Sequence, residues 1–197
     1  MSKIGILGGS FNPIHNGHIK IAEEVKRQLI LDDILFIPTG SAPHKDNSVF
    51  ASKEHRYNMV KLAVGNNFSV SDIEIKSEKL CYTVDTMTAV KELYPNDKLY
   101  YIIGADSLVH FMEWREPLKL FEMLSIVVVD RDGTDIDAVA DEYRQKYCAD
   151  ITICHMDRID ISATQIRNNF KIHKKSCGLV SPSVEEYIIN HNLYAEE

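Results

Sequence analysis

Two near-continuous apolar runs, at residues 98–104 and 124–129, constrain the fold more than any other feature of this sequence. Strands buried on both faces of a parallel sheet have this composition, whereas a half-exposed strand alternates apolar and polar residues. Parallel strands need long crossover connections, usually helices. The chain is therefore expected to alternate strands with helices.

The remaining periodicities predict this alternation. Further strands are expected at residues 3–8, 33–38, 68–75 and 150–155, and helices at 18–29, 53–64, 83–94, 118–123, 135–147, 163–170 and 182–191. Residues 39–49, rich in Gly, Ser, Pro and Asn, are typical of a loop. The expected fold class is α/β: a Rossmann-like, open, mostly parallel sheet with helices on both faces. We expect one domain (1–197), in which residues from about 161 to 197 form a small helical extension.

Charge and cysteine content exclude some classes of protein. Lys and Arg total 22 against 29 Asp and Glu, a net charge of −7, which argues against a general nucleic-acid binder but not against a protein that binds a small anion. No signal-peptide pattern or apolar run of ~20 residues is present, so a cytoplasmic protein without a membrane segment is expected. The four cysteines form no CxxC pair; buried, reduced thiols are favoured over a metal site at Cys148, Cys154 and His155.

A glycine-rich segment at residues 8–18 (Gly-Gly-Ser-Phe-Asn-Pro-Ile-His-Asn-Gly-His) directly follows the first expected strand. Ligands of open parallel sheets bind outside the carboxyl ends of the strands. The two leading glycines let backbone N–H groups approach a ligand closely. His15 and His18 lie at the start of a helix, where the dipole favours an anion. A phosphate site is favoured; a metal site at the two histidines and a purely structural turn are the alternatives.

A second segment, Ile161-Ser-Ala-Thr-Gln-Ile-Arg167, follows the last expected strand. Ser162 and Gln165 have the S-x-x-Q form of a capping box, so a helix should begin here. Thr164 and Arg167 are three residues apart and share a face of that helix near its N-terminus. A hydroxyl, a guanidinium and free N–H groups suit a di- or triphosphate. The alternative is a capped surface helix with an ion-paired arginine.

Together the two segments resemble the nucleotidyltransferase superfamily that carries an HxGH loop and an ISxTxIR segment. More narrowly, the chain is similar to the bacterial nicotinate mononucleotide adenylyltransferases. Further landmarks follow in the same order along essentially the whole chain: Pro43-His44-Lys45, His55-Arg56, Tyr82-Thr83, Gly104-Ala105-Asp106, Trp114 and Leu193-Tyr194. The departures are few: Ser10 and Asn12 stand where Thr and Asp are frequent, Ala42 where proline is usual, and Ala163 where serine is common.

The resemblance implies transfer of AMP from ATP to nicotinate mononucleotide (NaMN), which gives nicotinate adenine dinucleotide (NaAD) and pyrophosphate in NAD biosynthesis. The implied step is a direct in-line attack without a covalent intermediate. Because the nucleophile is already an anionic phosphate, hydrogen-bond donors and cationic groups are needed rather than a general base. The implied cofactor is Mg²⁺, carried mainly by the ATP phosphates, with no metal held by the protein itself.

The resemblance also implies the site residues. Its catalytic residues are His15, His18, Lys45 and Arg167. Its ATP-binding residues are Gly8, Gly9, Ser10, Phe11, His15, His18, Gly104, Asp106, Ile161, Ser162, Thr164 and Arg167. Its NaMN-binding residues are Asn12, His44, Lys45, Tyr82, Thr83 and Trp114. Arg56 is a further candidate, which would bridge phosphates of the two substrates together with Lys45 and His44. Three residues have an ordinary alternative: a helix ion pair for Arg56, a helix N-cap for Asp106 and a place in the core for Trp114.

Four other functions stay open at this point. A sister enzyme acting on nicotinamide mononucleotide, or on both nucleotides, would share the phosphate-binding groups, as would a phosphopantetheine adenylyltransferase. A non-catalytic nucleotide sensor and a metal-dependent hydrolase are less favoured. The expected partners are ATP and NaMN, with no nucleic acid and no membrane. A homodimer is open, because apolar residues of the last helix suit either the parent domain or a second subunit: Val184, Tyr187, Ile188 and Ile189.

Overall fold

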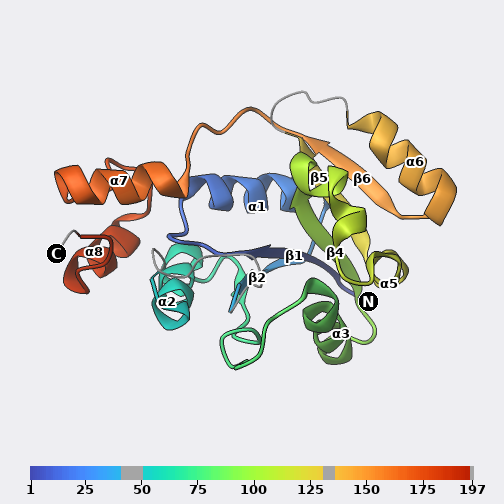
Figure 1. The fold of residues 1–197 in the computed structure, drawn as a ribbon, viewed down its shortest axis with the longest axis horizontal. Coiled ribbons are helices and arrows are strands. Elements are labelled where there is room, and N and C mark those ends of the chain that lie inside the picture. Colours follow the sequence, from blue (N-terminus) through green and yellow to red (C-terminus); the bar gives the residue numbers. More distant parts are fainter. Residues whose placement is uncertain (41–50, 131–135, 196–197) are drawn as a thin grey trace. The chain divides into compact units, whose positions relative to one another are not determined.

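The chain is described from a computed structural model, which covers residues 1–40, 51–130 and 136–195. Within them, six strands form one sheet in the order β3-β2-β1-β4-β5-β6 (Figure 1). The strands are β1 (Lys3–Gly9), β2 (Asp33–Pro38), β3 (Ser69–Val70), β4 (Lys98–Gly104), β5 (Ser125–Asp130) and β6 (Ile151–His155). The sheet is parallel and surrounded by helices, so the expected Rossmann-like α/β class is confirmed. The strand order reverses at β1, and ligands of open α/β sheets bind at such a point.

The two apolar runs form the buried centre of the sheet, as expected. Every residue of β5 is buried, and β4 is largely buried. The strands pair in parallel register, with Tyr101 opposite Ile126 and Ile103 opposite Val128. Burial of an aliphatic side chain of this size contributes about 1.5–3 kcal/mol. These two strands therefore form the stable centre of the sheet, and Asp106 follows β4 directly in the chain.

The helices agree with the expected ones to within a few residues at their ends. They are α1 (Asn16–Leu29), α2 (Lys53–Val64), α3 (Thr83–Leu93), α5 (Pro117–Met123), α6 (Asp137–Tyr147), α7 (Ala163–His173) and α8 (Pro182–Asn190). Two short elements were not expected: α4 (Ala105–Val109) and a 3-10 turn at Phe111–Glu113. Segments of three to five residues are too short to show helical periodicity.

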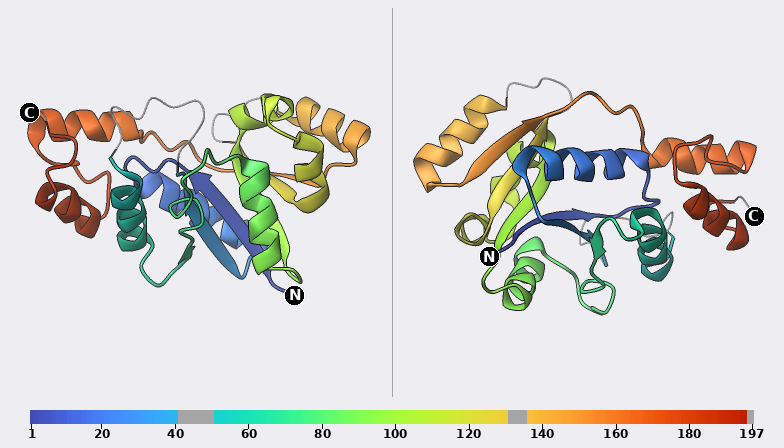
Figure 2. Two further views of the ribbon diagram at one scale, coloured as in Figure 1. Left: turned by 60° about the horizontal axis from the view of Figure 1, so that its bottom comes forward. Right: turned by 180° about the vertical axis from the view of Figure 1, so that it is seen from behind.

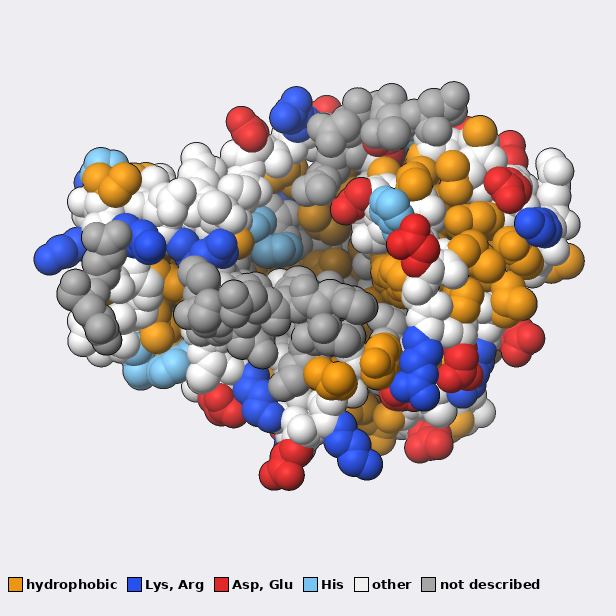
Figure 3. Space-filling model, viewed as in Figure 1, with side chains coloured by type: hydrophobic (Ala, Val, Ile, Leu, Met, Phe, Trp, Pro, Cys, Tyr) orange, Lys and Arg blue, Asp and Glu red, His pale blue; other side chains and the backbone are white. Residues whose placement is uncertain are grey.

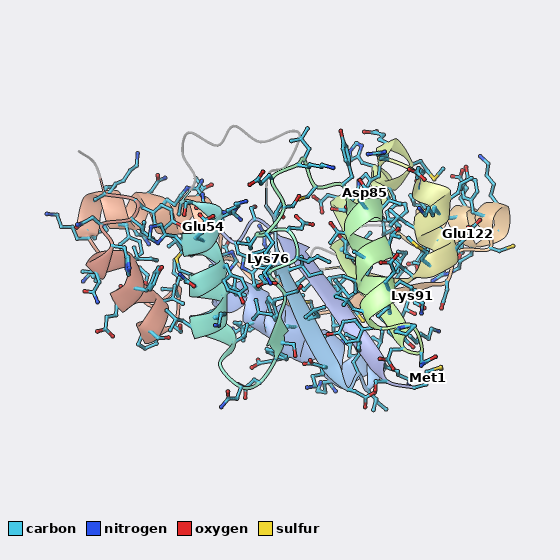
Figure 4. The ribbon with its side chains drawn as sticks, turned by 90° about the horizontal axis from the view of Figure 1, so that it is seen from below. Met1, Glu54, Lys76, Asp85, Lys91 and Glu122 are labelled. Carbon is cyan, nitrogen blue, oxygen red and sulfur yellow. The ribbon has the colours of Figure 1, made fainter. Side chains whose placement is uncertain are left out.

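The chain divides into two compact units. The first comprises Met1–Leu7, Ala22–Leu35 and Cys81–Ile159. Within it, α1 and α3 lie on opposite faces of the sheet (Figures 1 and 2). Asp85 in the first turn of α3 and Lys91 in the last, at opposite ends of the helix (Figure 4), both complement the helix dipole.

The second unit comprises Gly8–Ile21, Phe36–Leu80 and Asp160–Glu197. Here α8 packs against α2, with the hydroxyl of Tyr187 3.0 Å from Nδ1 of His55. Val184 and Ile188 of α8 are fully buried within the chain, whereas Ile189 is 51% exposed. A homodimer and a single-domain organisation with a helical part at 161–197 stay predictions.

The strand expected at residues 68–75 is wrong in its extent, because β3 spans only Ser69–Val70. Beyond it the chain turns: the N–H of Lys76 donates to the carbonyl of Asp72, and the N–H of Ile73 donates to the hydroxyl of Ser71. Short polar side chains that bond the nearby backbone compete with a sheet ladder. The alternating pattern of this segment therefore reflects a half-buried turn and not a strand.

The expectation of buried thiols holds for one cysteine only. Cys154 is buried, and burial raises the pKa of its thiol to about 11. Cys81 is half-buried, and Cys148 and Cys177 are exposed; all four are free thiols. Cys148 is the C-cap of α6 and Cys177 lies in the turn before α8, so both sit at surface turns with positive φ angles.

Candidate active site

The loop after β1 is held from several directions within the second unit. The N–H of Thr39, at the end of β2, donates to the carbonyl of Gly9. Phe11 adopts φ 44° and is buried, with its ring edge-on to His18 and tilted against Phe36. A Cβ on Gly9 would lie 3.1 Å from that ring, so glycine allows the close packing. A left-handed conformation at an aromatic residue costs about 1–3 kcal/mol and is typical of functional loops.

The two histidines of the loop lie against each other. The two rings are nearly parallel, with their centroids 3.7 Å apart. His15 is buried and His18 is half-buried. The backbone N–H of His15 donates to Nδ1 of His18 over 3.2 Å. Because a backbone N–H can only donate, Nδ1 of His18 carries no proton, and the neutral ring carries its proton on Nε2. His18 therefore offers Nε2–H as a hydrogen-bond donor.

Helix α1 begins at Asn16, inside the predicted motif and two residues earlier than expected. Its start is fixed from the segment before α8: the backbone N–H of Asn16 donates to the carbonyl of Leu179, and its side-chain amide donates to the carbonyl of Gly178. The N–H of His18 donates to the carbonyl of His15, which closes the first turn. The HxGH segment thus opens a helix, as the anion-site interpretation requires.

The second motif also opens a helix. Ser162 is the N-cap of α7, and its hydroxyl accepts from the N–H of Gln165, so the predicted capping is confirmed. Arg167 donates from Nη2 to the hydroxyl of Thr164 (3.0 Å) and from Nη1 to the backbone carbonyl of Asn12 (2.8 Å). Arg167 therefore links the two motifs, which lie side by side in one unit.

Arg56 is neither an exposed ion pair nor a surface residue; that interpretation is wrong. Its side chain is 4% exposed on α2. Nη1 donates to the carbonyl of Ser10 (2.6 Å), Nη2 to those of Thr39 (2.6 Å) and Gly40 (3.2 Å), and Nε to that of Ala51 (3.2 Å). One guanidinium thus joins three backbone segments around the glycine-rich loop. Burial of this kind leaves no periodic signal that would have predicted it.

Two arginines of the second unit, Arg56 and Arg167, lie beside the glycine-rich loop. Neither Arg56 nor Arg167 forms an ion pair with a carboxylate of the described residues. Figure 3 shows Lys and Arg side chains in a row over α7, with histidine side chains near its end, over the start of α1. Cationic groups and N–H donors at two helix starts are suited to a phosphate chain.

A metal site has no support in the part of the chain that is described. No group of three His, Cys, Asp or Glu residues there is arranged to hold a metal ion. The two histidines stack on each other, and Cys148, Cys154 and His155 form no such group.

The remaining predicted residues belong to the first unit or fall outside the described ranges. Gly104 is the N-cap of α4, so Asp106 is not, and the N-cap alternative for Asp106 is wrong. Instead, the carboxylate of Asp106 folds back over Gly104: a Cβ there would lie 2.6 Å from Oδ1. His44 and Lys45 lie outside the described residues.

Tyr82 and Thr83 lie at the start of α3, whose first N–H groups have no partner within the helix. The Arg115 guanidinium lies 4.7 Å from the centroid of the Tyr82 ring and pairs with Asp85. Trp114 is half-buried, with its ring stacked on Phe111 at a centroid distance of 4.9 Å. Trp114 is therefore only partly in the core.

Among the described residues, no helix is long and apolar enough to cross a bilayer. Residues 6–169 match the family model described as cytidylyltransferase-like. The fold agrees with this match, and the chain belongs to this class of nucleotidyltransferases.

Comparison with similar proteins identifies the family within this class of nucleotidyltransferases. The chain is 38% identical over 198 residues to a Carboxydothermus hydrogenoformans protein named "Probable nicotinate-nucleotide adenylyltransferase", with 98% of each covered. It is 35% identical over 196 residues to the Bacillus subtilis nicotinate-nucleotide adenylyltransferase, with 98% and 99% covered. The chain is thus a member of the nicotinate-nucleotide adenylyltransferase family. The Plasmodium falciparum nicotinic acid mononucleotide adenylyltransferase, solved in complex with NaAD, shares the fold at 21% identity, TM-score 0.78 and 98% coverage of both chains.

Proposed function

We propose that this chain transfers AMP from ATP to NaMN and releases NaAD and pyrophosphate in the cytoplasm. Family membership supports the reaction class. The observation that carries the proposal is the cluster of the second unit, in which Arg167 joins the ISxTxIR helix to the backbone of the HxGH loop at 2.8 Å. This arrangement gathers hydrogen-bond donors for phosphate oxygens.

The proposed step is a direct displacement at phosphorus. A phosphate oxygen of NaMN attacks the α-phosphorus of ATP, and the bond between that phosphorus and the oxygen bridging to the β-phosphate breaks. Charge develops on the α-phosphate oxygens and on the leaving pyrophosphate. Nε2–H of His18 donates to this developing charge. Thr164 and Arg167 hold the β- and γ-phosphates.

Other residues take the roles that the family resemblance gives them. His15, stacked on His18, and Lys45 contact phosphates; Gly8, Gly9, Ser10, Phe11, Ile161 and Ser162 line the ATP site; and Asn12 and His44 serve NaMN. The start of α3 at Tyr82 and Thr83 receives the nicotinate carboxylate, and Trp114 stacks on the pyridine ring. Mg²⁺ would accompany ATP and lower the negative charge of its phosphates, with phosphate oxygens and water rather than the described residues as its expected ligands.

This function is tested most simply by comparing different acceptor substrates for AMP. With ATP and Mg²⁺, pyrophosphate release is expected to be much faster with NaMN than with nicotinamide mononucleotide, because only NaMN offers a carboxylate to the N–H groups at the start of α3. Phosphopantetheine should support no turnover. Equal rates with both pyridine nucleotides would leave the chemistry standing and overturn the acid preference. Turnover with phosphopantetheine alone would contradict the function.

The packing of Asp106 on Gly104 yields a separate prediction. Gly104→Ala is expected to displace the Asp106 carboxylate, which we propose accepts a hydrogen bond from an ATP ribose hydroxyl. The KM for ATP should rise about 3–10-fold, the equivalent of one hydrogen bond. Thermal stability should hardly change, because the atom that must move is the end of an exposed side chain.

The double variant Gly104→Ala/Asp106→Ala is the control. Its KM for ATP should equal that of Asp106→Ala alone, because no carboxylate is then left to displace. Additive effects of the two substitutions would mean that Gly104 acts on ATP binding by another route.

A further inference from the structure

The side chain of Asn12 lies at the centre of a buried hydrogen-bond network. It is 3% exposed, and its Oδ1 accepts two hydrogen bonds, from the N–H of Ala51 (3.0 Å) and from the hydroxyl of Tyr194 (2.8 Å). Its backbone carbonyl accepts from Arg167. Ala51 is the first described residue after the segment that carries Lys45. One residue of the loop thus joins three distant parts of the chain.

Tyr194 reaches this network from the segment that follows α8. Its ring lies 6.4 Å from that of Phe170 on α7, and it is close enough to Arg56 and Arg167 for both to act on it electrostatically. Burial raises the pKa of Tyr194, so the hydroxyl keeps its proton at neutral pH and remains a donor. The hydroxyl is therefore able to donate to Asn12 at neutral pH.

An amide suits this position electrostatically. Its oxygen has two lone pairs, and both are used here by Ala51 and Tyr194. A carboxylate would accept the same two bonds but would place a negative charge beside Arg167, whose Nη1 is 2.8 Å from the carbonyl of the same residue. With asparagine, the charge of Arg167 stays available for phosphate oxygens.

We propose that Tyr194 is a positioning residue for the reaction, which acts through Asn12 to hold Arg167 and the HxGH loop in register with the chain at Ala51. The hydroxyl touches no substrate; it removes freedom from the side chain on which the network converges. Loss of this hydroxyl loosens donors whose geometry matters most in the transition state. This inference rests on the proposed function only for the choice of substrates.

Tyr194→Phe removes the hydroxyl and keeps the ring. It is expected to lower kcat about 3–10-fold, the equivalent of one hydrogen bond, with a smaller change in the KM for ATP. Tyr187→Phe is the matched control, because that hydroxyl bonds Asn58 and His55 between α8 and α2 and does not reach the loop. The control should lose a similar amount of thermal stability and keep kcat within twofold. Equal kcat in both variants would overturn the inference.

A double-mutant cycle tests whether Tyr194 acts through Asn12. The kcat of Asn12→Ala/Tyr194→Phe should match that of Asn12→Ala alone, because the acceptor is already gone. If the two effects multiply instead, the route through Asn12 is wrong.

Amide hydrogen exchange at Ala51 supplies a readout that needs no substrate. Tyr194→Phe should accelerate it about 3–10-fold, as Asn12 loosens, and Tyr187→Phe should leave it unchanged. Unchanged exchange in Tyr194→Phe would contradict the positioning role. If the wild-type protein fails to turn over NaMN while Ala51 exchange responds as stated, the proposed function fails and the positioning role stands.

Discussion

His18→Ala is expected to lower kcat for pyrophosphate release by about 10²–10³, the usual effect of removing one preorganised donor to developing charge. The reason is local geometry. The hydrogen bond from the backbone of His15 leaves Nδ1 of His18 without a proton, so the donor that faces away from that bond is Nε2–H. Alanine removes this donor, and with it the Nδ1 acceptor of the His15 backbone N–H. Steady-state kinetics with saturating ATP and NaMN measures the loss.

His173→Ala is the matched control, because His173 is exposed in the last turn of α7, in the same unit. It should keep kcat and the KM for ATP. The affinity of His18→Ala for a non-hydrolysable ATP analogue, measured by calorimetry, should fall far less than kcat. A His18→Ala enzyme with kcat within threefold of wild type would remove His18 from the catalytic machinery.

Arg56→Leu is expected to destabilise the protein by about 3–5 kcal/mol, because several hydrogen bonds to a charged group are lost together and each contributes about 1.5–3 kcal/mol. The four backbone carbonyls that bind its guanidinium, three of them partly buried and that of Gly40 buried, would lose their donor. For a chain of this size the melting temperature should fall by roughly 6–20 °C. Arg56→Lys should recover little of this stability, because a single ammonium group cannot reach carbonyls in all three backbone segments.

Arg27→Leu provides the comparison for Arg56. Arg27 pairs with Glu24 on the exposed face of α1, and surface pairs of this kind contribute little. The melting temperature of the Arg27→Leu variant should equal that of the wild-type protein. If Arg56→Leu also melts within 2 °C of wild type, water satisfies the four carbonyls. The Arg56 guanidinium would then not be what holds the three backbone segments together. Calorimetric scans of the three variants decide the matter.

Local patterns predicted those features that local physics determines. Two apolar runs predicted the centre of the sheet because a strand buried on both faces cannot carry polar residues. Ser162 and Gln165 predicted the start of α7 because helix starts need side-chain acceptors. The pattern failed at residues 68–75, where Ser71 bonds the backbone in a turn and apolar alternation persists without a strand.

Contacts across long stretches of chain were beyond such patterns. The burial of Arg56 depends on carbonyls up to 46 residues away, and the bond from Tyr194 to Asn12 spans 182 residues. Nothing within one turn of either residue distinguishes it from a surface residue. The place of Tyr194 beside the loop therefore emerged only from the folded chain. Family resemblance marks the segment Leu193-Tyr194 but gives no reason for it.

The central claim, AMP transfer to NaMN, is tested most directly by the balance of products from ATP. With Mg²⁺ and NaMN, the protein should release pyrophosphate and form NaAD in a one-to-one ratio, identified by mass. Without NaMN, it should release neither pyrophosphate nor AMP at a comparable rate. Pyrophosphate and free AMP in equal amounts, unaffected by NaMN, would show a hydrolase. ATP binding without any product would show a nucleotide sensor, and either result would contradict the claim.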